Sequence, residues 1–396
     1  MAIASCQLCN RQQWQTFSDI SFGIWEESST ILFRQNSVYP LSKCKHCGHV
    51  QISHEYTPAL FEKLYFHSTQ EAVMWHETLV GDNSPYEEMI DFALNDSTPK
   101  TVVDFGCGEG KLLAAANKRL PDSTLVGIDF NDRFSEDNIH YLSFDLNNLA
   151  QLPNQHWPEG IDLAMASHVL EHVINPVNFL QHIKQQLSPN GAVFIEVPDF
   201  SQHHTLQSIG MSNLVNLQHI HYYTADSITF AAKRAGFKVV KISRITTGYI
   251  PRLQVLLTPD EIVQSHPSSS LFDAANVIKH YQAQCRQLRA NLADALRESI
   301  SRDGKVGIWG VGADFYNLMT EHVDINDLIK QGNIVLFDFA LKDRILQQQP
   351  ILCSSQIPSA KYTVFMSPQL AETRIKMKSL SQDWHNVVDP FYTGND

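Results

Sequence analysis

The segment most informative about the fold is Val102-Val103-Asp104-Phe105-Gly106-Cys107-Gly108-Glu109-Gly110. Its apolar first half predicts a buried strand, the glycines predict a turn, and residues 111–119 predict a helix. Glycines at every second position let the backbone pass very close to a bound ligand. A dinucleotide-binding turn has its third glycine three residues after the second, where a pyrophosphate meets the helix start. That position is Lys111 here, so the spacing argues against a dinucleotide.

Strands and helices alternate after this turn. We predict strands at residues 102–105, 124–129, 140–144, 161–166, 191–197, 237–243 and 253–257, with helices at 176–187 and 224–235 among them. Such alternation predicts an α/β, Rossmann-like fold with a mainly parallel sheet covered on both faces. Ligands of such sheets bind at the carboxyl ends of the strands.

The bulk composition limits the possible partners. At 396 residues the chain is too long for one ordinary core, which predicts two or three domains. No apolar run approaches the roughly 20 residues that span a bilayer, and residues 1–10 lack a signal pattern, so we expect a cytoplasmic protein with no membrane partner. The net charge of −12 disfavours nucleic acid and favours a small-molecule substrate.

The run Asp104-x-Gly106-x-Gly108-x-Gly110 resembles motif I of the class I S-adenosylmethionine (SAM) methyltransferases. The resemblance implies that the turn cradles the methionine end of SAM. It also implies that Asp104 hydrogen-bonds, often through water, near the SAM ammonium group.

Further candidate SAM contacts stand at the ends of the next predicted strands. Asp129, at the end of the second strand, can accept hydrogen bonds from both ribose hydroxyls. Asp145 and Leu146 follow the third strand, where the family commonly contacts adenine, and His168 lies in the position of the family's motif IV. Any one of these residues alone is explained by a turn, a helix cap or a surface charge. Their order at successive strand ends is what favours SAM.

Four cysteines form two C-x-x-C pairs, Cys6 with Cys9 and Cys44 with Cys47. Two such knuckles complete a closed tetrahedral zinc site, which predicts a structural metal rather than a catalytic one. Residues 1–60 carry little apolar surface, so a metal would help them to fold. His46 and His49 could compete as ligands; free cysteines or redox dithiols fit less well, because neither pair opens a helix after a strand.

The segment Asn216-Leu217-Gln218-His219-Ile220-His221-Tyr222-Tyr223-Thr224 precedes a predicted helix above the presumed SAM site. Its histidines and tyrosines offer a general base and phenolic hydrogen-bond partners. We take His219, His221 and Tyr222 as candidate catalytic residues. The alternative is a polar surface loop in which a tyrosine belongs to the core.

The last part of the chain predicts a second, smaller Rossmann-like domain. A linker at residues 260–271 and a long apolar-faced helix at 272–302 precede a strand and the turn Gly310-x-Gly312. That partial glycine pattern is either a turn that helps to hold substrate or a feature of the fold alone. We therefore predict a zinc-binding module at 1–60, a SAM-binding domain at 61–260, and a linker, long helix and Rossmann-like domain at 261–396.

In this order the parts resemble the nucleotide-deoxysugar C-methyltransferases, which methylate C3 of nucleotide-linked 4-keto-6-deoxysugars. The resemblance covers nearly the whole chain. It implies that the zinc module and the C-terminal domain help to enclose a nucleotide-sugar, and that His219 is the base of an E-H-L-S-Y-F loop.

The chain departs from that family at several positions. Gln218 replaces the Glu of the loop and His221 replaces its Ser, while Asn216 and Leu217 stand where the family has Tyr and His. Residues 313–315 replace a small, lysine-bearing run.

Three functions follow from these residues. The first is C-methylation, in which His219 removes a proton beside a ketone and Tyr222 orients or stabilises the enolate oxygen. The second is O- or N-methylation of another small metabolite or sugar, which the missing carboxylate at position 218 keeps open. The third is a SAM-binding scaffold without catalysis. No feature of the sequence indicates an oligomeric state.

Overall fold

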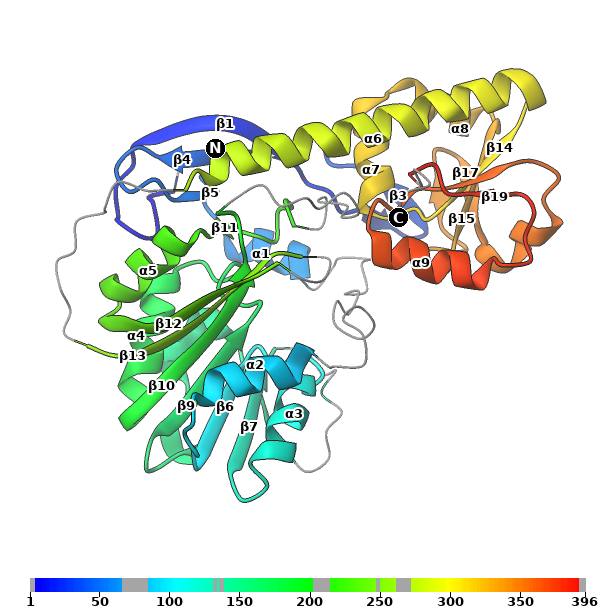
Figure 1. Cartoon of the computed structure of the whole chain (residues 1–396). Coiled ribbons are helices and arrows are strands. Elements are labelled where there is room, and N and C mark those ends of the chain that lie inside the picture. The colour runs from blue at the N-terminus through cyan, green and yellow to red at the C-terminus, as the bar shows by residue number, and fades with distance from the viewer. Residues whose placement is uncertain are drawn as a thin grey trace.

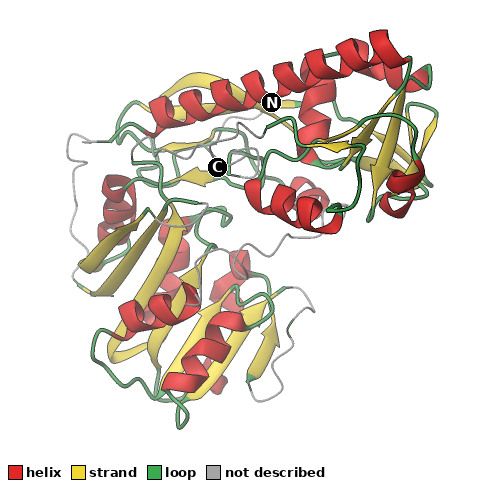
Figure 2. Ribbon diagram, turned by 45° about the vertical axis from the view of Figure 1, so that its right-hand side comes forward, coloured by secondary structure: helices red, strands yellow, loops and turns green. Residues whose placement is uncertain are grey.

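The strand that leads into the glycine turn lies inside a seven-stranded sheet (Figures 1 and 2). The computed structural model describes residues 4–65, 85–130, 134, 139–201, 214–246, 250–260 and 272–391. The strand order is β12 (Phe237–Ile245), β13 (Arg252–Pro259), β10 (Leu187–Pro198), β9 (Ile161–Ser167), β6 (Thr101–Phe105), β7 (Thr124–Asp129) and β8 (His140–Ser143). The strands from β10 to β8 are parallel, and β13 runs antiparallel to both its neighbours. The predicted strands are thus confirmed, in a sheet that is mixed at one edge.

Helices cover both faces of this sheet (Figure 2). The core on one face includes α2 (Pro85–Leu94) and α3 (Lys111–Arg119), and the core on the other includes α4 (Pro176–Gln186) and α5 (Ala225–Arg234). Val102 belongs to the first core, while Val103 and Phe105 belong to the second, because successive strand residues point to opposite faces. Helix α3 begins and ends at the predicted residues.

A second sheet joins the N-terminal residues to the loop before α5. Its order is β1 (Trp14–Ser21), β4 (Val38–Cys44), β5 (Val50–Ile52) and β11 (His221–Tyr222), and all its pairings are antiparallel. Helix α1 (Pro58–Tyr65) follows β5. The candidate catalytic loop therefore pairs with the cysteine-bearing segment rather than standing free above the large sheet.

The C-terminal residues form a third sheet that also takes in an N-terminal hairpin. Its order is β19 (Val387–Val388), β18 (Val364–Met366), β14 (Val306–Trp309), β15 (Ile334–Asp338), β17 (Gln349–Cys353), β16 (Ile345–Leu346), β3 (Ile31–Phe33) and β2 (Glu26–Ser28). Around it lie α7 (Ala313–Glu321), α8 (Asp324–Lys330) and α9 (Ala371–Leu380). Residues 26–33, predicted to belong with the zinc module, thus extend the C-terminal sheet.

The remaining predicted turn, Gly310-x-Gly312, connects β14 to α7. The Val311 N–H donates to the Asp338 carboxylate at 2.7 Å. The Asp338 carboxylate also accepts from the backbone of Ala340 and Leu341. These backbone hydrogen bonds to Asp338 hold the turn and the following loop in place. The fold alone therefore explains the glycine pattern of the turn.

The long helix α6 (Ala274–Asp303) runs from the N-terminal sheet to the C-terminal one (Figure 1). The Ser18 hydroxyl donates to Gln282 near its start, and the Arg289 guanidinium holds Glu321 of α7 with two hydrogen bonds of 2.8 and 2.7 Å. Among the described helices, α6 included, none is long and apolar enough to cross a membrane. The predicted linker lies, apart from Asp260, outside the described residues.

Candidate active site

The glycine turn packs directly against the segment that follows β9. Gly106 has a φ of +81°, and a Cβ built there would lie 2.3 Å from the Val169 side chain. A Cβ on Gly108, at φ +52°, would meet no atom of the described residues within 4 Å. The first glycine is therefore needed for close packing, and the second leaves the backbone open to a ligand.

Two aspartates flank the turn at the carboxyl ends of β6 and β7. The Gly108 N–H donates to Asp129 Oδ2 at 2.9 Å, which ties the turn to the second strand. Asp104 is buried, and its Oδ1 has no hydrogen-bond partner among the described residues. Burial, with the charge of Asp129 nearby, raises the pKa of Asp104 to about 8. A buried carboxyl group without a partner is costly, which is expected where a cationic ligand group supplies the missing contact.

The structure places Asp145 and Leu146 after β8 as predicted. Asp145 is exposed, and its carboxylate caps the 3-10 helix η1 (Leu146–Gln151) by accepting from the Asn147 N–H at 2.9 Å. Leu146 is half-buried and would lie 3.6 Å from a Cβ on Gly106. Leu146 thus borders the turn, whereas the Asp145 carboxylate already serves the local backbone.

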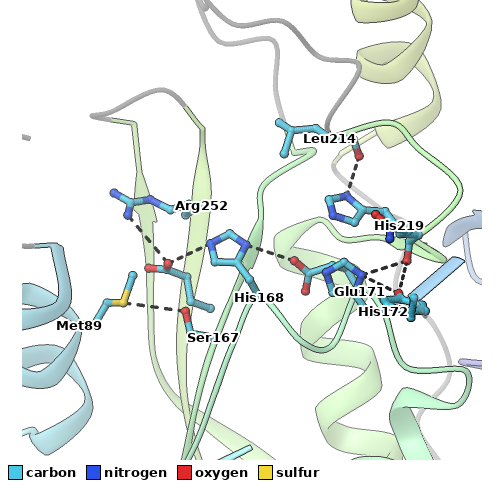
Figure 3. A network of polar contacts seen from close by, with 11 residues as sticks. Met89, Ser167, His168, Glu171, His172, Leu214, His219 and Arg252 are labelled. Atoms are coloured by element: carbon cyan, nitrogen blue, oxygen red, sulfur yellow. Dashed lines mark hydrogen bonds and ion pairs between the residues drawn. The ribbon is translucent and has the colours of Figure 1, made fainter. Parts of the chain in front are cut away.

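His168 lies between the buried carboxylates of Glu171 and Glu196, and Figure 3 shows its contact with Glu171. Its Nδ1 is 3.2 Å from Glu171 Oε1 and its Nε2 is 3.3 Å from Glu196 Oε1. Burial would lower the pKa of His168, but the two glutamates more than offset this and raise it to about 9. Arg252 and Gln254 complete the network around Glu196. Each ring nitrogen thus lies within 3.3 Å of a glutamate oxygen, and the SAM contact of His168 stays a prediction.

Glu171, His172 and His219 converge beside this network (Figure 3). One ligand-type atom from each lies within 4.8 Å of the other two, and the His172 and His219 ring centroids are 4.7 Å apart. The His219 Nδ1–H donates to the Leu214 carbonyl at 2.8 Å, which leaves the lone pair on Nε2. Burial, with His172 nearby, lowers the pKa of His219 to about 3, so the ring is neutral and its Nε2 carries a lone pair.

The sequence pattern predicted His219 as a catalytic residue, but it did not predict Glu171 or His172. Burial would raise the pKa of Glu171, but the hydrogen bond from His168 and the neighbouring His172 bring it down to about 2. A carboxylate therefore stands beside His219 although position 218 is a glutamine. The Gln218 side chain instead donates to the Leu64 carbonyl at 2.8 Å. The signal in the sequence was the spacing His168-x-x-Glu171-His172, which places three titratable groups in five residues.

The other two candidate catalytic residues make contacts within the protein. His221 Nδ1 is 3.1 Å from His49 Nε2, and its Nε2 donates to the Val173 carbonyl at 3.1 Å. Tyr222 is fully buried in the core, and its hydroxyl donates to the Asn216 carbonyl. The polar side-chain atoms of both residues thus have partners within the protein, and the catalytic roles of His221 and Tyr222 stay predictions.

The four N-terminal cysteines come together as predicted. Their sulfur atoms all lie within 4.8 Å of one another, with Cys6 Sγ 3.5 Å from Cys47 Sγ and Cys9 Sγ 3.6 Å from Cys44 Sγ. Zinc–sulfur bonds of about 2.3 Å in a tetrahedron place sulfur atoms about 3.8 Å apart. The four thiols fit such an ion. His49, one of the two rival ligands, forms a hydrogen bond with His221 instead.

Comparison with known proteins agrees with this geometry. Residues 82–242 match a family model described as a methyltransferase domain. Similar curated proteins include the mitochondrial ubiquinone biosynthesis O-methyltransferase of Dictyostelium discoideum (28% identity, 24% of this chain and 34% of the relative) and the trans-aconitate 2-methyltransferase of Rhodopseudomonas palustris (29%, 26% and 40%). A tRNA U34 carboxymethyltransferase of Pseudoalteromonas translucida is 24% identical over 48% of this chain and 60% of its own length.

The chain thus spans less than two thirds of the length of each of these relatives. Among solved structures, an S-adenosylmethionine dependent methyltransferase from Mesorhizobium loti is 17% identical, with a TM-score of 0.36 over 44% of this chain and 98% of that one. In chain order, the family match extends from just before α2 into β12. It includes the glycine turn and the Glu171–His172–His219 cluster. Residues 82–242 therefore carry a methyltransferase domain.

Proposed function

We propose that the protein transfers the methyl group of SAM to a carbon atom of a small molecule, with His219 as the base. The observation that carries the proposal is the position of the Glu171–His172–His219 cluster beside the glycine turn. The turn touches Val169, which lies between His168 and Glu171 in the chain. A methyl donor on the turn and an acceptor at the cluster would therefore be neighbours.

The residues around the turn suit the two ends of SAM. Asp104 Oδ1, which has no partner among the residues that the structure describes, would accept from the SAM ammonium group. The open face of Gly108 would admit the methionine backbone. Asp129, at the end of β7, would accept from the ribose hydroxyls. Leu146 beside the turn would contact the adenine.

The cluster suits proton removal next to a carbonyl group. The proton would pass from the acceptor carbon to His219 Nε2, and the electron pair of the broken C–H bond would form an enolate. The enolate carbon would then attack the SAM methyl group as the sulfur–methyl bond breaks and S-adenosylhomocysteine leaves. The Glu171 carboxylate would stabilise the resulting imidazolium, as a glutamate at position 218 would do in the deoxysugar C-methyltransferases.

The substrate class that we propose is a nucleotide-linked 4-keto-deoxysugar. Its support is the order of the parts, with a four-cysteine cluster, a methyltransferase sheet and a C-terminal α/β sheet joined by α6. The four cysteines would hold a structural zinc ion, because their sulfur separations suit a closed tetrahedral site. A ketone beside an acidic C–H bond is the group that a base at His219 requires.

Proton exchange in the absence of SAM tests the proposal. We expect the protein to exchange deuterium from solvent into the carbon next to the ketone of a 4-keto-deoxysugar nucleotide. His219→Ala should slow both exchange and methyl transfer by about 10²-fold or more, while SAM affinity stays near the wild-type value. His140→Ala, which removes an exposed histidine outside the cluster, is the matched control. Methyl transfer without exchange, or an unchanged rate in His219→Ala, would contradict C-methylation with this base.

A further inference from the structure

The Glu171–His172–His219 cluster has the composition of a metal site. It combines two imidazoles and one carboxylate, and one donor atom of each lies within 4.8 Å of the others. The donors come from two separate segments, the turn after β9 and the loop before β11 (Figure 3). Two histidines and one carboxylate with open positions form a recurrent site for first-row transition metals.

Hydrogen bonds to backbone carbonyls fix the tautomer of both imidazoles, so the same ring nitrogen carries the lone pair in each. The His172 Nδ1 lies 3.0 Å from the Gln218 carbonyl, and the His219 Nδ1 lies 2.8 Å from the Leu214 carbonyl. A carbonyl oxygen only accepts, so each Nδ1 carries the proton and each Nε2 carries the lone pair. Metal-binding histidines are typically oriented in this way, with the second ring nitrogen donating to a backbone carbonyl.

The two oxygens of the Glu171 carboxylate differ in their hydrogen bonding. Glu171 is 1% exposed, and its Oε1 is 3.2 Å from His168 Nδ1. Its Oε2 is buried and has no hydrogen-bond partner among the described residues. An ionised oxygen at such depth without a partner is unfavourable unless a cation supplies one.

We propose that Glu171 Oε2, His172 Nε2 and His219 Nε2 bind a divalent first-row transition-metal ion such as Zn²⁺. Three protein ligands leave at least one coordination position open for water or another oxygen. The site is thus distinct in chemistry from the four-cysteine cluster, which would be closed and all-sulfur. His168 is not a ligand, because its two nitrogens are directed at Glu171 and Glu196.

Metal binding bears on the proposed function because it uses the same atom of His219. A lone pair that coordinates an ion cannot accept a proton. This consequence rests on the proposed function: Zn²⁺ or Co²⁺ at the cluster should inhibit methyl transfer, and a chelator that empties only this site should restore it. The binding itself requires neither SAM nor an acceptor.

Cobalt titration of the full chain tests the binding. We expect the chelator-treated protein to take up two equivalents of Co²⁺, measured without SAM or acceptor. One equivalent should show the intense thiolate-to-cobalt charge-transfer bands of a sulfur site. The other should show only weak ligand-field bands, as nitrogen and oxygen ligands produce.

Variants of the cluster residues test whether the second equivalent of Co²⁺ binds at the cluster. His172→Ala and Glu171→Gln should each lose the weak bands and keep the thiolate bands, which also reports that the protein is folded. Tyr65→Phe should weaken binding of the second ion by about 10-fold to 100-fold, because the Tyr65 hydroxyl contacts His172 Nδ1 at 3.0 Å. His140→Ala should bind both ions as the wild-type protein does.

Uptake of a single equivalent with thiolate bands would overturn the proposal, as would a second equivalent that the cluster variants leave unchanged. These outcomes do not depend on methyl transfer. If the wild-type protein binds the second ion but exchanges no proton with any 4-keto sugar, the metal site stands and the proposed function fails. If exchange occurs without a second ion, the proposed function stands and the metal site fails.

Discussion

Two acidic side chains of the methyltransferase domain are buried where a ligand could meet them. Asp104 and Glu171 are both nearly inaccessible, and each has one carboxylate oxygen without a partner among the described residues. Their pKa values nevertheless move in opposite directions. Asp104 has another carboxylate, Asp129, nearby, whereas Glu171 accepts from the His168 imidazolium. The neighbours therefore decide which buried acid is ionised.

SAM binding should release a proton from Asp104. With a pKa of about 8, this carboxyl is mainly protonated at pH 7, whereas pairing with an ammonium group requires the carboxylate. We expect SAM affinity to fall about tenfold per pH unit between pH 7 and pH 6. Calorimetry in buffers of different ionisation enthalpy measures the released proton, and Asp104→Asn should abolish the release.

The same pKa shift sets the sign of a stability effect. The pKa of Asp104 is higher in the folded protein than its ordinary value of 3.8, so the folded state binds more protons. The contribution of Asp104 to the free energy of unfolding should therefore fall as the pH rises from about 4 to about 8. Asp104→Asn should remove that slope in urea titrations; a slope that persists in the variant would show that another group is responsible.

At the scale of elements, the short strand β11 connects the cysteine cluster to the proposed base. Cys44 ends β4, β4 pairs with β5, and β5 pairs with β11, which begins two residues after His219. The stacked rings of His49 and His221 add a side-chain contact to the same pairing. The position of His219 thus depends on a segment more than 160 residues away in the chain.

Loss of the cysteine site should loosen β5 and β11 before it affects the large sheet. We expect Cys9→Ser to lower the local opening free energy of these strands by about 2 kcal/mol or more, while β6, β7 and β9 keep their protection. Hydrogen exchange measures both groups of amides. Cys353→Ser, outside the cluster, is the control; equal loss across all strands would contradict this local effect.

Helices were more predictable than the pairings that join them. The start of α3 at Lys111 and the end of α6 near Gly304 were readable from local glycine and apolar patterns. The pairing of β5 with β11 and of β3 with β16 was not, because β strands acquire partners at any sequence separation. For the same reason Glu171 and His172 escaped selection: their partner His219 lies in another segment.

In the molecule as a whole, the N-terminal residues connect the cysteine-bearing sheet to the C-terminal sheet. Trp25 is buried, its indole N–H donates to the Val311 carbonyl, and its ring lies 4.9 Å from that of Tyr316. The hairpin after it extends the C-terminal sheet, while β1 before it and β4 and β5 beyond the hairpin belong to the cysteine-bearing sheet. The first sixty residues thus contribute strands to two of the three sheets.

Trp25→Ala should separate the hairpin from the C-terminal sheet. Removal of a buried tryptophan costs about 3–5 kcal/mol, whereas Trp25→Phe keeps most of the packing and leaves the Val311 carbonyl without its donor, for about 1–3 kcal/mol. Urea unfolding measures both values, and limited proteolysis near residues 21–34 reports the release. Phe339→Ala, at a site that is 71% exposed, should change stability by less than about 0.5 kcal/mol.

Local sequence patterns were enough to predict the α/β sheet, the glycine turn with its two aspartates, the two cysteine pairs and the long helix, because each depends on residues close together in the chain. Contacts between distant segments bring Glu171 and His172 beside His219 and give His221 a hydrogen-bond partner in His49, and the fold also gives Tyr222 a partner within the protein. Spacing along a chain does not encode which lone pairs and charges folding brings together.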